Sequence, residues 1–301
     1  QKSVEGMAGV SGRTRQEGKG NLPSVEANAS EKLYMIAYIP DHFKSYTKAE
    51  DDRPLEYEQE YLIGGKQNDM ENLQIVVSPR NKERAQMLHE KYPEIVSIAA
   101  DNQEVVDRSD WVFAALLPKA AEEILKPLHI GPEKKFINLV ATLSLKRIEE
   151  MFGQREILAD VVPLTFAANR FGPVVIYPDI PEVVDLMSHV GKPVPVDTPK
   201  QIAILRSTTG LMSAYYMLLT VIIQWCERNG LDEPSARAYI TEFTGALSRK
   251  AATWGGDLED LAREMTPGGL NWMALTHLEE KDAYTPWTEI LNPILEKVIK
   301  E

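Results

Sequence analysis

Short apolar segments alternate with helix-like segments along the first two thirds of this 301-residue sequence, and this alternation restricts the fold most strongly. Short, uninterrupted apolar runs are typical of strands that are buried on both faces of a sheet. Strands separated by helices of about ten residues form βαβ units, in which the strands lie parallel. The pattern therefore predicts an α/β fold with a doubly wound, Rossmann-type parallel sheet.

The expected elements follow from this pattern. Strands are expected at 33–39, 73–77, 95–99, 111–117, 136–140, 157–162 and 174–177, and helices between them at 55–65, 81–92, 102–107, 120–128 and 144–152. Beyond residue 198 the strand pattern stops, and helices are expected at 200–229, 234–254, 257–264, 269–280 and 285–300. The chain is thus expected to divide into a flexible N-terminal tail (1–31), an α/β domain (32–197) and an all-helical domain (198–301).

Composition excludes several classes of function. The chain has 33 Lys and Arg against 45 Asp and Glu, a net charge of −12, which argues against binding a nucleic-acid phosphate backbone. Cys226 is the only cysteine, so neither an internal disulfide nor a cysteine-rich metal site is possible, and a reducing, cytoplasmic location is expected. The five histidines lack the spacing of metal ligands, so no metal site is expected.

No segment is expected to cross a membrane. The most apolar run, 211–225, is interrupted by polar residues and is shorter than the roughly 20 residues of a spanning helix, so we expect a core or interface helix there. Residues 1–31 lack the apolar stretch of a secretory signal and carry acidic residues that a transit peptide would avoid.

A nucleotide site is expected at the carboxyl ends of the strands, where doubly wound sheets bind their ligands. The glycine-rich G-x-G-x-x-G loop that holds a pyrophosphate after the first strand is absent, and the polar segment 40–54 takes its place. The second strand is followed by Ser78, Arg80, Asn81 and Lys82, whose side chains suit the 2′-phosphate of NADP. The alternative is a solvated strand-to-helix turn, with Ser78 or Asn81 as the helix N-cap.

A second candidate site lies in the helical region. Residues 266–271, with the sequence Thr-Pro-Gly-Gly-Leu-Asn, interrupt two expected helices. Successive backbone N–H groups of such a turn can hold a carboxylate. The alternative is a plain connection between helices.

Six stretches of the sequence match, in order, those of one enzyme family. They are 62–65 (LIGG), 101–106 (DNQEVV), 110–118 (DWVFAALLP), 209–215 (TGLMSAY), 229–231 (NGL) and 266–271 (TPGGLN). From about residue 33 to residue 298 the chain resembles pyrroline-5-carboxylate reductase. This family reduces a cyclic imine to proline with NADPH or NADH, and it combines a Rossmann domain with a helical dimerisation domain.

Several positions depart from the pattern of the family. The segment 40–54 replaces the glycine-rich loop, Leu117 stands where a lysine usually precedes Pro118, and Asn271 replaces a threonine that contacts the substrate. Residues 161–165 keep only part of the family's M-P-N-T-P motif. The resemblance therefore implies a divergent member.

The resemblance implies a role for each matching position. Residues expected to bind the cofactor, with NADPH preferred over NADH, are Ser78, Arg80, Asn81, Lys82, Asn102, Ala115, Leu116, Pro118 and Pro163. Gly268, Gly269 and Asn271 are expected to hold the substrate carboxylate, with Asn271 and Thr266 as catalytic residues. The substrate is expected to be a small imine or amino acid, and the protein a homodimer through its helical domain. The alternative is a homologue that lost its phosphate loop and acts as a binding or scaffolding dimer.

Overall fold

The computed structural model describes residues 36–37 and 73–300. The chain divides into two units, Gln1–Glu31 and Lys32–Glu301, and all described residues lie in the second. The expected tail, the expected helix at 55–65, the segment 40–54 and the motif at 62–65 lie outside the described residues.

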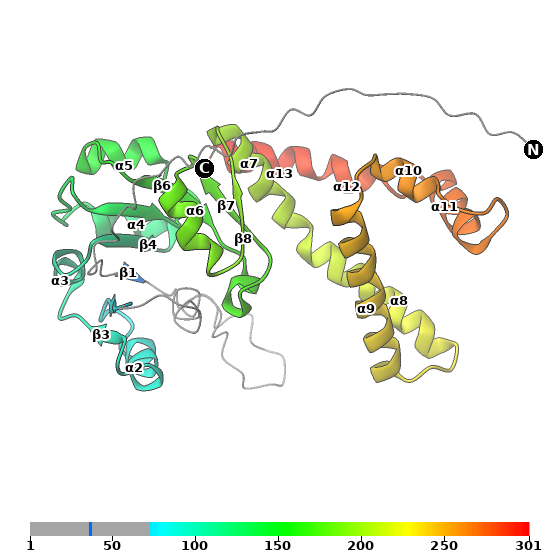
Figure 1. Ribbon diagram of the computed structural model, residues 1–301, viewed down its shortest axis with the longest axis horizontal. Helices are drawn as coiled ribbons and strands as arrows, with labels where there is room; N and C mark the ends of the chain where they lie inside the picture. The colour runs from blue at the N-terminus through cyan, green and yellow to red at the C-terminus, as the bar shows by residue number, and fades with distance from the viewer. Residues whose placement is uncertain (1–35, 38–72, 301) are drawn as a thin grey trace, which may run out of the picture. The chain divides into compact units, whose positions relative to one another are not determined.

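A mostly parallel sheet forms the α/β part of the described chain (Figure 1). Its strands are β1 (Ile36–Ala37), β2 (Ile75–Val77), β3 (Val96–Ile98), β4 (Trp111–Ala115), β5 (Lys135–Asn138), β6 (Leu158–Val162), β7 (Pro173–Tyr177) and β8 (Lys192–Pro195). Six of them pair in the order β1-β4-β5-β6-β7-β8, and β2 pairs with β3 and lies beside β1. The order 3-2-1-4-5-6 is that of the doubly wound dinucleotide-binding fold, so the predicted fold class is confirmed.

Two features of the sheet differ from the expectation. Strand β7 runs antiparallel to β6, whereas all other pairs are parallel. Residues 163–172 between these strands are too few for a parallel crossover, which needs a dozen or more residues. The sequence pattern also missed β8, because two prolines interrupt its four residues. Prolines are tolerated there because β8 is an edge strand.

Alternate residues of β2, β4, β5 and β6 enter two separate cores, one on each face of the sheet. Ile137 packs in the same cluster as residues of α2 (Lys82–Lys91) and α6 (Pro181–Ser188). Its neighbour Phe136 packs in the other cluster, with residues of α3 (Asn102–Asp107), α4 (Pro118–Leu125) and α5 (Leu145–Phe152). Successive side chains of a strand point to opposite faces of the sheet, so both faces are apolar. A sheet that is covered by helices on both sides requires this.

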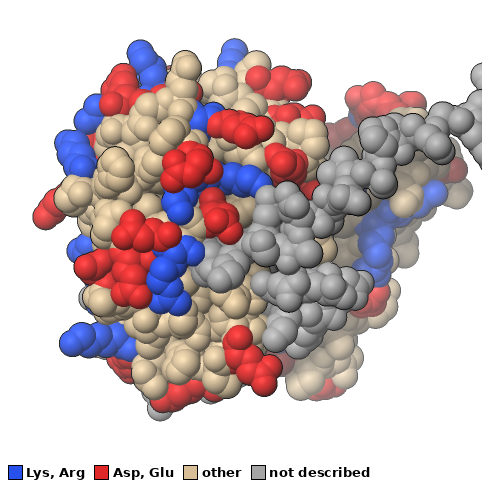
Figure 2. Space-filling view, turned by 60° about the vertical axis from the view of Figure 1, so that its left-hand side comes forward, with Lys and Arg blue, Asp and Glu red and all other residues tan. Residues whose placement is uncertain are grey.

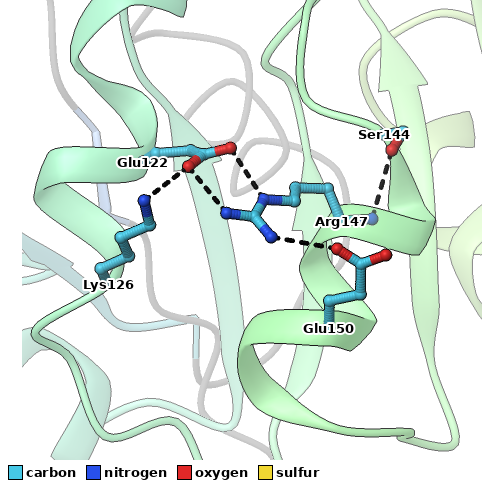
Figure 3. A network of polar contacts seen from close by, with 5 residues as sticks. All are labelled: Glu122, Lys126, Ser144, Arg147 and Glu150. Atoms are coloured by element: carbon cyan, nitrogen blue, oxygen red, sulfur yellow. Dashed lines mark hydrogen bonds and ion pairs between the residues drawn. The ribbon is translucent and has the colours of Figure 1, made fainter.

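Charged side chains join α4 and α5 on the second face (Figure 3). Arg147 donates from Nε to Glu122 Oε1 at 2.8 Å and from Nη2 to Oε2 at 3.0 Å, and Lys126 Nζ lies 2.8 Å from Glu122 Oε2. Hydrogen bonds from Arg147 and then Lys126 lower the pKa of the Glu122 carboxyl to about 2. Arg147 also donates to Glu150 at 3.0 Å, and Ser144 caps α5. These contacts hold the start of α5, and therefore the β5–α5 loop, against α4.

The remainder of the described chain is helical, as expected. Its helices are α7 (Pro199–Thr208), α8 (Met212–Arg228), α9 (Glu233–Thr253), α10 (Leu258–Arg263), α11 (Leu270–Glu280), α12 (Thr285–Glu289) and α13 (Leu291–Lys300). A 3₁₀ turn at Thr209–Leu211 joins α7 to α8 where one helix was predicted. Gly210 in this turn has low helix propensity. Helix α13 packs against α7, and α8 packs against α9.

The stretch Pro199–Arg228 is long and apolar enough to cross a membrane by length and composition, and only 6% of its most apolar window is buried in the chain. Its exposed side chains include Met217 at 61% and Trp225 at 59%. Of the two alternatives expected for this run, a core helix or an interface helix, the low burial favours an interface helix.

Candidate functional site

The carboxyl ends of the parallel strands bring several predicted residues to one edge of the sheet. Ser78 follows β2, Leu116 follows β4, and Pro163 follows β6. Parallel strands end at the same edge, and ligands of doubly wound folds bind there. The structure thus supports treating this edge as the candidate site.

A hydrogen bond joins the end of β2 to the start of α3. Ser78 is 5% exposed, and its Oγ donates to Asn102 Oδ1 at 2.6 Å. The same Oγ accepts from the backbone N–H of Arg80 at 3.3 Å. These contacts fix two of the predicted cofactor residues, 24 positions apart in sequence, next to one another.

Asn81 is the N-cap of α2, since its side-chain oxygen accepts from the backbone N–H of Arg84 at 3.2 Å. This is the capping role that the sequence left open for Asn81. The neighbouring side chains of Arg80 and Lys82 are exposed. Arg80 precedes the N-cap and Lys82 begins α2, and Glu83 is the acidic residue of the first turn. The two cations at the start of the helix suit an anionic group.

At the carboxyl end of β4, backbone groups are more accessible to a ligand than side chains are. Leu116 is 7% exposed and belongs to the core, so only its backbone could reach a ligand. Ala115 is half-buried, and Pro118 is exposed at the first turn of α4. Proline suits this position because the first N–H groups of a helix have no intrahelical partner.

Two polar residues that the sequence analysis did not single out lie in the adjacent strands β5 and β6. Asn138 ends β5 and pairs in register with Asp160 of β6. Asn138 Nδ2 lies 2.5 Å from Asp160 Oδ1 and 2.7 Å from the Leu143 carbonyl oxygen, and Asn138 Oδ1 accepts from Val140 N–H at 3.1 Å. Asn138 is 1% exposed and Asp160 is 9% exposed. The amide thereby holds the carboxylate and the turn after β5 together.

Burial raises the pKa of the Asp160 carboxyl from 3.8 to about 6, and the hydrogen bond from Asn138 and the charge of Arg206 oppose the rise. A buried acid with a raised pKa destabilises the fold when it is ionised. Such groups are concentrated at functional sites, although structural networks also contain them. Asp160 is therefore a candidate functional residue.

Asp160 lies on the wall of a cavity of about 400 Å³. The β5–α5 loop (141–144), the first turns of α7 and the end of α13 form the other walls. Arg206 of α7 also lines the cavity, and its Nη1 donates to the Ala141 carbonyl oxygen at 2.6 Å. The volume falls within the range of about 300–1,000 Å³ that is typical of small-molecule sites.

The predicted substrate turn, Thr266–Asn271, is exposed except at Gly269, which is half-buried. Gly268 has φ of +73°, a conformation that favours glycine. The hydrogen bonds of the turn are local, from Gly269 N–H to the Thr266 carbonyl at 2.9 Å and from Met273 N–H to the Gly269 carbonyl at 3.0 Å. Among the described residues, no hydrogen bond or ion pair joins this turn to the carboxyl edge of the sheet.

Acidic and basic side chains are mixed over the described part of the face in Figure 2. A protein that binds nucleic acid by its phosphates presents a surface rich in Lys and Arg instead. Among residues 36–37 and 73–300, no group of three or more His, Cys, Asp or Glu side chains could hold a metal ion.

Two family models match parts of the chain. Residues 63–142 match the family described as NADP oxidoreductase, coenzyme F420-dependent. Residues 1–79 match a family of unknown function, DUF5702. No curated protein matches the chain.

Solved structures of pyrroline-5-carboxylate reductases share the fold. The enzyme from Streptococcus pyogenes has a TM-score of 0.71 at 18% identity, covering 90% of this chain and 98% of that one. The enzyme from Coxiella burnetii has a TM-score of 0.72 at 18% identity, and the match covers 91% of this chain and 98% of that one. The Plasmodium falciparum pyrroline carboxylate reductase, solved with NADP bound, has a TM-score of 0.66 at 18% identity. This match covers 89% of this chain and 96% of that one. The resemblance predicted from the sequence is thus confirmed for the fold.

Proposed function

We propose that this protein is an NAD(P)H-dependent oxidoreductase of the pyrroline-5-carboxylate reductase type, which reduces a cyclic imine. The observation that carries the proposal is the agreement of fold over about 90% of the chain with reductases of that name. The match of residues 63–142 to an NADP oxidoreductase family supports it independently, because that segment includes Ser78, Arg80 and Asn102.

The described residues fit a dinucleotide that carries a 2′-phosphate. Arg80 and Lys82 supply exposed positive charge, and the linked Ser78 and Asn102 supply polar groups beside it. The cofactor would supply the hydride, and the protein would position the two reactants. NADPH is preferred in this proposal because a 2′-phosphate favours cationic partners over the acidic residue that usually binds the ribose of NAD.

The proposed substrate is a five-membered cyclic imine that carries a carboxylate. Its carboxylate would be held at this turn by the backbone N–H of Gly268 and by a hydrogen bond from the Asn271 amide. The N–H of Gly269 donates to the Thr266 carbonyl oxygen, so Gly269 would shape the turn around the carboxylate. Thr266 is proposed, with Asn271, as a catalytic residue. Asn271 cannot relay a proton as a threonine hydroxyl can, so its proposed role is to bind and orient.

Asn271→Ala is expected to lower kcat/KM for the reduction of 1-pyrroline-5-carboxylate about 10- to 100-fold. A lost hydrogen bond to a charged group is worth about 1.5–3 kcal/mol. The measurement is the rate of NADPH oxidation by the full chain with and without the imine. Asn292→Ala, an exposed asparagine of α13, is the matched control and should have no effect. Equal rates for Asn271→Ala and the parent protein would remove Asn271 from the site.

We further propose that the exposed apolar side chains of α8 and α9 are covered by a second copy of the chain. Met217, Trp225, Tyr239, Phe243 and Leu247 are each at least 47% exposed. Apolar side chains gathered on two packed helices mark an interaction surface in a soluble protein. An isologous pair would bury this surface on both copies.

Met217→Glu is expected to convert the homodimer into a monomer, because a buried carboxylate without a partner opposes association. Light scattering after size exclusion should give twice the chain mass of 33.8 kDa for the parent and the single mass for the variant. Phe171→Glu is the control, since Phe171 is 56% exposed but lies after β6, outside α8 and α9. A monomeric parent protein would refute this proposal.

A further inference from the structure

The cavity beside Asp160 combines opposite charges with apolar walls. Asp160 supplies a carboxylate, and Lys200 and Arg206 of α7 supply cations. Leu143 and Ile202 are among the apolar residues of the lining. Arg206 partly offsets the charge of Asp160, and Lys200 adds a second cation. A ligand complementary to this lining would carry both charges and an apolar part.

One oxygen of Asp160 is committed and the other remains for a ligand. Oδ1 accepts from Asn138 Nδ2, and among the described residues this is the only hydrogen bond of the carboxylate. The side chain is 9% exposed and lines the cavity. Burying an ionised carboxylate costs desolvation free energy, and pairing with a cation offsets part of this cost. A cationic group of a ligand would provide such a pairing.

Other groups in the lining of the cavity favour a carboxylate. The guanidinium of Arg206 is held by its hydrogen bond to the Ala141 carbonyl, 65 residues earlier in the chain. Lys200 lies in the first turn of α7, and Ser144 is the N-cap of α5, so two helices begin at the cavity. Helix N-termini add positive potential to that of the two side chains.

We propose that this cavity binds a small α-amino acid with an aliphatic side chain. Its ammonium group pairs with Asp160, its carboxylate lies on the side of Lys200 and Arg206, and its side chain contacts the apolar wall. This site is distinct from the turn at 266–271 and shares no residue with it. The proposal stands beside the proposed reductase function and does not depend on it.

The experiment is isothermal titration calorimetry of the full chain with L-leucine at a pH near 8, where Asp160 is ionised. Two analogues each delete one charge: 3-methylbutylamine lacks the carboxylate, and 4-methylpentanoate lacks the amine. L-leucine is expected to bind one per chain, and each analogue at least about tenfold more weakly, since a charged hydrogen bond contributes about 1.5–3 kcal/mol. Absence of L-leucine binding, or equal binding of either analogue, overturns the proposal.

Substitutions in and outside the cavity test whether L-leucine binds there. Asp160→Asn is expected to weaken L-leucine binding at least about tenfold, whereas Asp185→Asn, at an exposed acid of α6, leaves it unchanged. Far-UV circular dichroism establishes that both variants are folded. Loss of binding in Asn271→Ala with none in Asp160→Asn would place the amino acid at the turn and overturn the assignment. A failed imine-reduction assay together with Asp160-dependent binding would refute the reductase and keep this site.

Discussion

Asp160→Asn is expected to raise the free energy of unfolding by about 3 kcal/mol more at pH 8 than at pH 3. The reason is the burial that raises the pKa of Asp160 from 3.8 to about 6. Each pKa unit corresponds to about 1.4 kcal/mol of preference for the protonated form in the folded state. Asparagine keeps the shape and polarity of the side chain but cannot ionise.

The sign of this effect follows from proton linkage. Between about pH 4 and pH 6 the folded state retains a proton that the unfolded state has released. Stability contributed by Asp160 therefore falls as the pH rises through this window, and above it the ionised carboxylate imposes its full cost. Below the window both states are protonated and the cost disappears.

Urea denaturation of the parent and the variant at both pH values measures this difference. The control is Asp185→Asn, because Asp185 is exposed and its substitution should change the free energy of unfolding little. A destabilised Asp160→Asn at pH 8 would mean that the carboxylate is favourable in the fold, contrary to the desolvation argument. A stabilised variant would instead identify Asp160 as a residue retained at a cost to the fold.

Arg80→Ala is expected to weaken NADPH binding about 10- to 100-fold while changing NADH binding less than about threefold. The guanidinium is exposed at the turn after β2, where a 2′-phosphate would lie. A charge-assisted hydrogen bond to phosphate is worth about 1.5–3 kcal/mol, and NADH has no phosphate at that position. Fluorescence titration of each nucleotide against parent and variant gives the two dissociation constants.

Lys91→Ala is the matched control for this experiment. Lys91 is an exposed cation at the last turn of α2, whereas Lys82 begins the same helix. Its removal should leave both affinities within about twofold, because a solvent-exposed charge about 14 Å along a helix is largely screened. If Arg80→Ala weakened the binding of NADPH and of NADH equally, Arg80 would contact a part that is common to both nucleotides.

Apolar patterning predicted the strands of the sheet well where both faces are buried. The runs around Trp111 and Phe136 lie in strands because alternate residues enter the two cores. The same reasoning could not predict the direction of β7, which depends on the length of its connection. It also missed β8, whose prolines are typical of an edge strand.

The candidate site could be predicted only in part. Ser78 and Asn102 were each expected to bind the cofactor, but their hydrogen bond to one another was not predicted. Asn81 caps a helix, as the local sequence allowed. Asn138 and Asp160 were missed because each is the single polar residue of an expected strand, at 136–140 and 157–162, that is otherwise apolar. A polar residue within an apolar strand was the only sign of them in the sequence. That the two side chains meet follows from the pairing of β5 and β6 in register.

The most direct test of the proposed function is a thermal-shift titration of the full chain with NADPH and NADH. A ligand that binds only the folded state stabilises it by about 2.7 kcal/mol at a concentration 100 times its dissociation constant. We predict a melting temperature that rises by several degrees with NADPH and by less with NADH at equal concentration. No rise with either nucleotide would contradict the proposal that this chain is an NAD(P)H-dependent reductase.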